Sequence, residues 1–246
     1  MKFLVLISQV PDTTARIAFT ADGAHYDGTG VTWIVNPYDE WYALVRAIEL
    51  KEALGGTVTT VTVGGADTEA TIRKALAIGA DEAVRIDAQP DDAFGVAARI
   101  AAFAKDKAFD VILAGKETID HNGSQVGAMV AELLDLPYVP LASKLEITGT
   151  TATIERDVPG GVEVLQVDTP FALSAAKGMA EQRIPNMRGI MAARTKPLQV
   201  VPDMAVGSLT KVARFELPPA KQAVKMIPAD EAGKLIELLH TEAKVI

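Results

Sequence analysis

Short apolar runs alternate with helical patterns through residues 1–140 of the chain. The runs are residues 3–7 (FLVLI), 57–63 (TVTTVTV), 82–86 (EAVRI) and 110–114 (DVILA). They are rich in β-branched side chains and are bounded by Gly, Asp or Pro, which is typical of buried parallel strands. Because such strands alternate with helices, the pattern predicts an α/β fold with a doubly wound, mostly parallel sheet.

Three helices are predicted between these strands. Residues 36–56 begin with Asn36 as an N-cap and Pro37 in the first helical position, and they end at a pair of glycines. Residues 66–81 carry one apolar face, and residues 91–107 form an alanine-rich pattern. The apolar face of the second helix comprises Ile72, Ala75 and Leu76.

Other parts of the chain follow different patterns. Residues 17–34 are predicted to form a hairpin or an extended excursion, and residues 144–174 alternate as an antiparallel meander. From residue 176 the chain becomes irregular, apart from a helical pattern at 228–243. Residues 207–246 hold little core pattern, so we expect this tail to pack on the rest of the domain or on a partner.

Composition narrows the possible functions. The chain has 246 residues, 49% of them hydrophobic, which suits one large domain or one domain with an appendage. A formal net charge of −8 disfavours nonspecific nucleic-acid binding. The absence of cysteine excludes disulfides, thiolate metal sites and thiol nucleophiles. The first apolar run is too short for a signal peptide and none is long enough to span a membrane, so we expect a soluble, cytoplasmic protein.

The loop at residues 115–124 is the main candidate site. It follows the fourth strand, and ligands of open α/β sheets bind beyond the carboxyl ends of the strands. The next helix places its apolar residues on one face: Val126, Met129, Val130, Leu133 and Leu134. Its first turn presents free N–H groups, Gly123 permits close approach, Ser124 can cap and Lys116 adds positive charge. This pattern suits an anion such as a phosphate.

Two further loops converge on the same sheet edge, at Asn36 and at Gly64–Gly65. Together the three loops favour a nucleotide pocket. From spacing alone, the structural alternative that these residues only end strands and begin helices is slightly favoured. The sequence contains no P-loop and no G-x-G-x-x-G motif to decide between them.

Catalytic signals are weak. Asp120, His121 and Ser124 are crowded into one loop, which seldom gives the geometry of a triad, and the G-x-S-x-G elbow is absent. The histidines do not have metal-ligand spacing. Glu163 is interpreted, from spacing alone, as an exposed strand carboxylate.

Several blocks along nearly the whole chain resemble the β subunit of electron transfer flavoproteins. They are VLISQVPD, NPYDEWYALVRAIELKE, TIRKALAIGAD, LAGKETIDHNGSQVGAMVAELLDLP, RDVPGGVEVLQVDTP and EQRIPNMRGIMAARTKPL. The fourth is the most specific, because the family carries Gly-Lys-Gln-(Ala/Ser)-Ile-Asp there, followed by Gln-(Thr/Val)-Gly. Matching positions are Gly115, Lys116, Ile119, Asp120, Gln125 and Gly127, whereas His121 and Asn122 replace acids.

The resemblance implies an adenine-nucleotide-hydrolase-like fold and a heterodimer with a larger α subunit that holds most of the FAD. It implies structural AMP in this chain, or a second FAD if the protein is electron-bifurcating. The motif HNGSQV keeps only the Gln-Val of the bifurcating pattern, so AMP is favoured. The implied cofactor-binding residues are Leu6, Asn36, Pro37, Tyr38, Asp39, Val63, Gly115, Lys116, Glu117, Thr118, Ile119, Asp120, His121, Asn122, Gly123, Ser124, Gln125 and Val126.

The resemblance also implies docking surfaces. Residues 181–191 match the family's recognition loop for dehydrogenases, with Met187 in the anchor position and Arg188 in place of a proline. Glu163 matches an acid used against the mobile flavin domain of the α subunit. Residues 1–195 would form the α/β domain, and 196–246 an extended arm on the α subunit. The other implied docking residues are Arg183, Ile190 and Met191.

The function implied is that of an electron carrier without covalent catalysis of its own, which shuttles electrons from dehydrogenases to a quinone-linked acceptor. One alternative is a stand-alone adenine-nucleotide binding module of the universal-stress type, but such modules lack the meander and the tail. Another is an enzyme, either adenylating or a serine hydrolase. The first would need a Ser-Gly-Gly loop where the chain has ISQVPD, and the second lacks its elbow.

Overall fold

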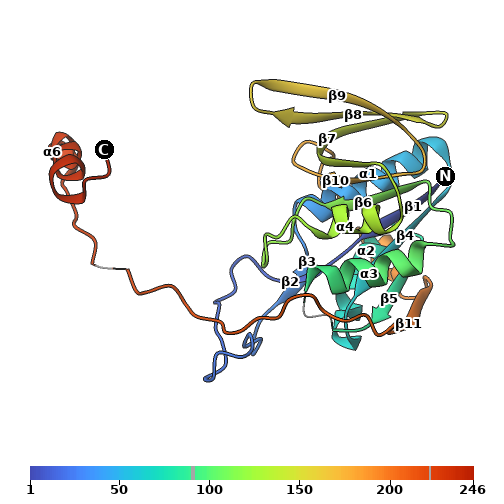
Figure 1. The fold of residues 1–246 in the computed structure, drawn as a ribbon, viewed down its shortest axis with the longest axis horizontal. Helices are drawn as coiled ribbons and strands as arrows, with labels where there is room; N and C mark the ends of the chain where they lie inside the picture. Colours follow the sequence, from blue (N-terminus) through green and yellow to red (C-terminus); the bar gives the residue numbers. More distant parts are fainter. Residues whose placement is uncertain (90–91, 222) are drawn as a thin grey trace.

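A mixed sheet organises the part of the chain that the structure describes, residues 1–89, 92–221 and 223–246 of a computed structural model (Figure 1). Its nine strands follow the order β11-β5-β4-β1-β6-β10-β7-β8-β9. The strands that run parallel to one another are β1 (Lys2–Leu6), β4 (Thr57–Val63), β5 (Glu82–Asp87), β6 (Val111–Gly115), β10 (Phe171–Ala175) and β11 (Leu198–Pro202). Strand β7 (Tyr138–Thr148) also pairs in parallel, with β10, whereas β8 (Thr151–Val158) and β9 (Gly161–Asp168) extend the sheet by antiparallel pairing.

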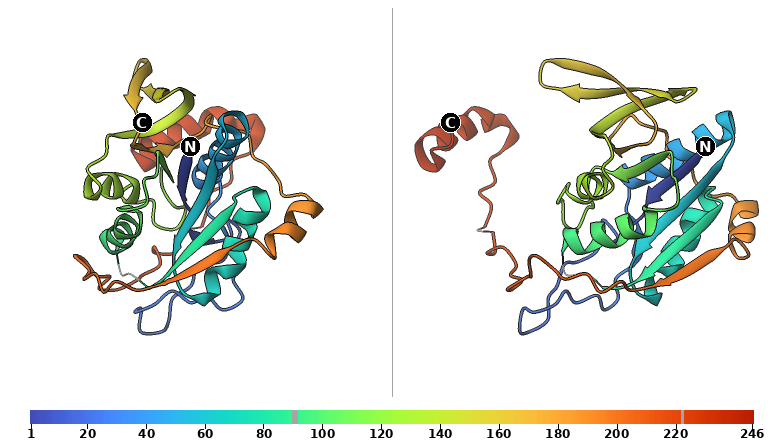
Figure 2. Two further views of the ribbon diagram at one scale, coloured as in Figure 1. Left: turned by 90° about the vertical axis from the view of Figure 1, so that its right-hand side faces the viewer. Right: turned by 45° about the vertical axis from the view of Figure 1, so that its right-hand side comes forward.

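Helices cover both faces of this sheet (Figure 2). Side chains of β1 alternate between two cores: Phe3 and Val5 pack with α1 and α2, while Leu4 and Leu6 pack with α3 and α4. The predicted α/β fold and its four parallel strands are therefore confirmed. The helices are α1 (Asp39–Leu54), α2 (Glu69–Ile78), α3 (Ala93–Ala104), α4 (Val126–Leu133), α5 (Met187–Ala193) and α6 (Ala232–Leu238), with η1 (Ala66–Thr68) preceding α2.

The helix signals of the sequence hold in part. Asn36 was expected as the N-cap of the first helix, but α1 begins at Asp39 and Tyr38 occupies the N-cap position. The Asp92 carboxylate accepts a hydrogen bond from the Gly95 N–H at 2.7 Å and so caps α3, while Asp91 of the predicted helix lies outside the described residues. On α4, Val130 is buried as predicted. Leu133 was expected on the same apolar face, but its side chain is 45% exposed because α4 ends there and the chain turns away.

The antiparallel meander was predicted one strand too long. Strands β7, β8 and β9 pair antiparallel as expected. Residues 171–174 were assigned to the same meander, but they belong to β10, which lies between β6 and β7 and runs parallel to both. All five residues of β10 are buried, which is the pattern of a central parallel strand covered on both faces.

The segment after residue 176 is more regular than predicted. Helix α5 packs on α2, and β11 adds to the sheet edge by pairing in parallel with β5. The excursion at residues 17–34 agrees with its prediction, because it is flanked by an antiparallel ribbon of β2 (Gln9–Pro11) and β3 (Trp33–Val35).

Beyond β11 the chain runs past α3 and then away from the sheet (Figure 1). Asp203 pairs with Arg99 on α3, and Asp92 accepts hydrogen bonds from the Leu209 and Thr210 N–H groups. The Phe215 ring stacks on Phe19 with 4.9 Å between centroids. Figure 1 shows α6 away from the sheet. The helical pattern predicted at 228–243 is present as η2 (Ala229–Glu231), α6 and the π-helical turn η3 (Leu239–Ala243).

Candidate functional site

Asn36 joins three segments at the carboxyl edge of the sheet. Its side chain is fully buried. The amide nitrogen donates to the Glu117 carbonyl oxygen at 2.9 Å, and the amide oxygen accepts from the Ile119 N–H at 3.0 Å. Its own N–H donates to the Ser8 carbonyl oxygen at 3.0 Å. Since a buried amide is stable only when its polar atoms are bonded, these contacts fix the loop after β6 against the start of α1.

Gly115 allows the end of β6 to touch the first turn of α1. A Cβ at this position would lie 2.7 Å from the backbone nitrogen of Glu40, closer than real Cβ contacts come. The glycine in the predicted loop is therefore required by packing within the chain.

Glu40 is a buried acid beside this contact, with only 4% of its surface exposed. Its carboxylate accepts from the Ser8 N–H at 2.6 Å and from the Ser8 hydroxyl at 2.7 Å. Burial, reinforced by the nearby charges of Asp120 and Asp39, raises the pKa of Glu40 to about 8, although the Ser8 bonds oppose this rise. The carboxyl group is therefore held in large part protonated at neutral pH.

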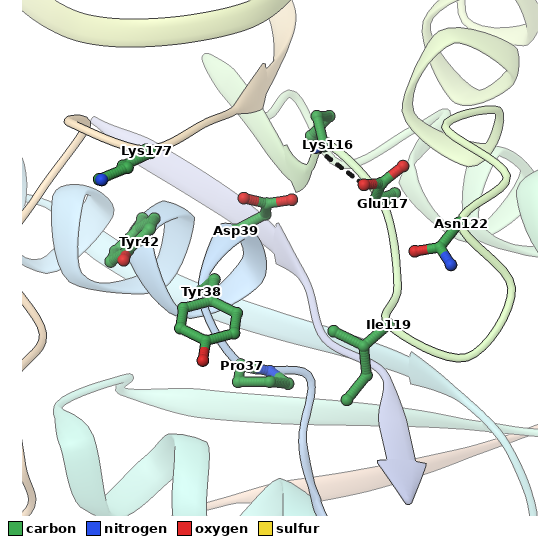
Figure 3. A pocket seen from close by; sticks show the side chains of 9 residues that line it. All are labelled: Pro37, Tyr38, Asp39, Tyr42, Lys116, Glu117, Ile119, Asn122 and Lys177. Atoms are coloured by element: carbon green, nitrogen blue, oxygen red, sulfur yellow. Dashed lines mark ion pairs between the residues drawn. The ribbon is translucent and has the colours of Figure 1, made fainter. Parts of the chain in front are cut away.

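A cavity of about 250 Å³ opens at this edge (Figure 3). Two acids, Asp39 and Glu117, and two bases, Lys116 and Lys177, contribute to its wall. Burial raises the pKa of Asp39, whereas the bond from Lys116 lowers the pKa of Glu117. The Lys116 ammonium lies 2.8 Å from the Glu117 carboxylate. The full lining is Pro37, Tyr38, Asp39, Tyr42, Lys116, Glu117, Ile119, Asn122 and Lys177.

The loop from residue 122 to α4 has the geometry of an anion site. Ser124 has a φ of 51°, and Gln125 follows with right-handed geometry. When neighbouring residues adopt left-handed and right-handed backbone conformations, their N–H groups point to the same side. They then form a concavity that suits anions. The expectation that Ser124 caps α4 was wrong: Gln125 occupies the N-cap position, and the Ser124 hydroxyl donates to the Glu117 carboxylate at 3.0 Å. The first turn of α4 follows directly, and its N–H groups have no acceptor within the helix.

The other predicted cofactor residues do not line the cavity. Leu6 is buried at the end of β1, and Val63 ends β4. The Thr118 carbonyl oxygen accepts from the Asn122 N–H, which closes the loop. His121 is exposed, with its ring 3.8 Å from the Asp120 carboxylate. The remaining predicted residues, Gly123 and Val126, belong to the loop and to the first position of α4.

The predicted docking residues lie on two other surfaces. Glu163 on β9 pairs with Arg156 of β8. Arg183 forms an ion pair with Glu52 at 2.8 Å. The start of α5 exposes an apolar patch, with 73% of Met187 accessible. The other members of this patch are Ile190 and Met191.

Sequence reasoning missed Ser8, Glu40, Tyr42 and Lys177. Lys177 follows β10, and the Lys116 N–H donates to the Ala175 carbonyl oxygen at 3.0 Å, so the two lysines approach the same cavity. Interpreting the mostly apolar run FALSA as a parallel strand would have placed Lys177 at this edge. Ser8 had a comparable signal, because it follows the first strand directly.

These features define a class: a doubly wound α/β protein with a cavity, lined in part by charged residues, beyond the carboxyl ends of its parallel strands, where this class binds its ligands. None of the described helices is both long and apolar enough to cross a membrane.

The comparisons with known proteins identify the family. The family model for the electron transfer flavoprotein domain matches residues 24–206. Electron transfer flavoprotein subunit beta of Bacillus subtilis is 41% identical over 100% of both chains. The subunit beta of Syntrophomonas wolfei is 38% identical over 100% of this chain and 98% of its own, and that of Homo sapiens 32% over 97% and 98%. The chain belongs to the electron transfer flavoprotein family, as a β subunit.

Proposed function

We propose that this chain pairs with an α subunit to form a heterodimeric electron transfer flavoprotein, and that it carries electrons without covalent catalysis of its own. Membership of the β-subunit family supports the pairing and the involvement of a flavin. In this proposal the FAD is held mainly by the α subunit and supplies the reversible redox chemistry. The chain itself completes the flavin site and presents a docking surface to dehydrogenases, from which electrons pass to a quinone-linked acceptor.

The cavity at the carboxyl edge is the proposed AMP site, and it is the observation that carries the proposal. Its loop is fixed by the buried Asn36, and an anion-binding concavity begins at Ser124. The residues present fit a nucleoside monophosphate. The N–H groups from Ser124 into α4, with Lys116, would hold the phosphate, and the uncharged part would lie along the wall formed by Pro37 and Ile119.

The apolar start of α5 is the proposed dehydrogenase-docking surface. Met187 and Met191 are 73% and 66% exposed, and flexible thioether side chains fill irregular apolar pockets well. The Asn186 side chain accepts from the Gly189 N–H at 2.9 Å and caps the helix. This fixed helix start would present the methionines in a defined orientation.

Nucleotide analysis of the heterodimer tests the proposal. The chain is purified with its α partner, and the released nucleotides are separated by chromatography and counted per heterodimer. One FAD and one AMP are expected. Two FAD and no AMP would mean that a second flavin occupies the site in place of AMP. Absence of any adenine nucleotide would refute the proposal that the cavity binds a nucleotide.

A pair of glycine variants localises the nucleotide. Gly115→Ala places a Cβ against the Glu40 backbone, so we expect loss of AMP with FAD retained in the α subunit. Gly161→Ala is the matched control, because a Cβ there meets nothing within 4 Å. Equal AMP content in the two variants would refute an AMP site at this edge of the sheet.

A further inference from the structure

Glu117 holds the two side chains of the loop that are best suited to bind a phosphate. One carboxylate oxygen lies 2.8 Å from the Lys116 ammonium, and the other accepts from the Ser124 hydroxyl at 3.0 Å. A carboxylate and a phosphate make the same kinds of contact with an ammonium and a hydroxyl group. The side chain therefore uses the groups that a bound phosphate would use.

The charge nearest to Lys116 and Ser124 is negative, although Lys177 adds a second base to the cavity wall. Lys116 is the base that contacts Glu117, and Asp39 adds a second acid to the wall. The bonds from Lys116 and Ser124 lower the pKa of Glu117, so its carboxylate stays ionised at neutral pH. A phosphate at the start of α4 would therefore meet a fixed negative charge within the same loop.

The loop itself does not depend on the Glu117 side chain. Asn36 binds the carbonyl oxygen of Glu117 and the N–H of Ile119, both of them backbone atoms. The Asn122 N–H donates to the Thr118 carbonyl oxygen at 2.9 Å. Neutralising the carboxylate would leave this framework in place, so its charge can be tested separately from the fold of the loop.

We propose that Glu117 is a specificity-determining residue that competes with the nucleotide phosphate for Lys116 and Ser124. It weakens binding of phosphorylated nucleotides while leaving recognition of the uncharged nucleoside unchanged. The proposal rests on the AMP site described above and names the residue that sets its affinity.

The test compares AMP and adenosine binding to the heterodimer carrying the wild-type chain, Glu117→Gln, or the control Glu146→Gln. The amide keeps the size of the side chain and an oxygen acceptor but removes the charge. Glu146 is an exposed acid on β7, paired with Lys144, so its variant removes the same charge from a site outside the cavity. Binding is measured by exchange of radiolabelled AMP against unlabelled AMP or adenosine, and folding is checked by thermal unfolding.

For Glu117→Gln we expect AMP to bind about tenfold more tightly, the size of one charge removed at close range in a partly exposed site. Adenosine affinity should change less than about twofold, because it carries no phosphate. AMP affinity that is unchanged or weaker would overturn the proposal and leave the AMP site standing. Equal tightening of AMP and adenosine would also overturn it. If the wild-type heterodimer binds neither, the AMP site fails and this inference fails with it.

Discussion

Glu40 offers a sharp test of the electrostatics at the carboxyl edge. Replacing it with glutamine keeps the shape of the side chain, and the amide can accept from the Ser8 N–H and donate to the Ser8 hydroxyl. Glu40→Gln thus mimics the protonated acid while removing its ability to ionise. A pH series that compares the two proteins isolates this one group, because all other titrating residues are shared.

The size of the effect follows from the pKa. Burial raises the pKa of Glu40 from 4.5 to about 8. Because the folded chain holds the proton more tightly, the stability linked to this group is fully present below about pH 4.5 and is lost as the pH rises through about 8. At 1.36 kcal/mol per pKa unit, the full span is on the order of 5 kcal/mol. Solvent and side-chain relaxation would reduce this figure.

The assay is urea unfolding of the chain at several values between about pH 5 and about pH 8. We expect similar free energies of unfolding for the wild-type chain and Glu40→Gln at the acidic end. At the alkaline end the variant should be more stable by a few kcal/mol. Glu132→Gln, on an exposed position of α4, controls for loss of one surface charge.

Parallel pH curves for the wild-type chain and Glu40→Gln would refute the reasoning. Lower stability of the variant at the alkaline end would do so as well, because it would mean that the ionised carboxylate is the form that the folded chain prefers.

Three further perturbations address other parts of the chain. Gly189→Ala should destabilise the protein by about 1–3 kcal/mol in thermal unfolding, because the added Cβ overlaps the Ala77 carbonyl oxygen, whereas Gly207→Ala meets no neighbour and should be close to neutral. Asp92→Ala removes the cap of α3 and the anchor of the tail, so limited proteolysis should cut the tail faster, and an unchanged cleavage rate would contradict this anchor. Met187→Ala should weaken dehydrogenase docking about tenfold or more without changing AMP content, and Met187→Leu should retain it.

The sequence predicted the central strands because their signals are local. Residues 57–63 and 110–114 combine β-branched composition with clear boundaries, and they correspond to β4 and, within one residue, to β6. The position of β10 depends on its pairing partners, which are about 30 to 60 residues earlier in the chain, and periodicity does not encode such distances. Its mostly apolar sequence, FALSA, was present but was assigned to the neighbouring meander.

The candidate site was predictable to the same extent. The loop after β6 and the start of α1 do meet, because parallel strands share a carboxyl edge. The side-chain contacts within the site were harder to predict from the sequence. The Ser124 hydroxyl contacts Glu117 instead of capping α4, and the buried pair of Ser8 and Glu40 joins two segments far apart in sequence. Such contacts depend on side-chain placement in three dimensions, which spacing along one strand or helix does not determine.

Helix α1 connects the cavity to residues 181–191 and to strand β7 of the meander. Tyr42 lines the cavity, and the neighbouring Trp41 indole N–H donates to the Arg183 carbonyl oxygen at 3.2 Å in residues 181–191, the proposed docking segment. One turn further, the Arg46 guanidinium donates to the Leu145 carbonyl oxygen at 2.9 Å on β7. A substitution in α1 is therefore expected to alter nucleotide content and docking together. Glu117→Gln on the loop after β6 and Met187→Ala on α5 separate the two, because each changes one surface while α1 stays intact.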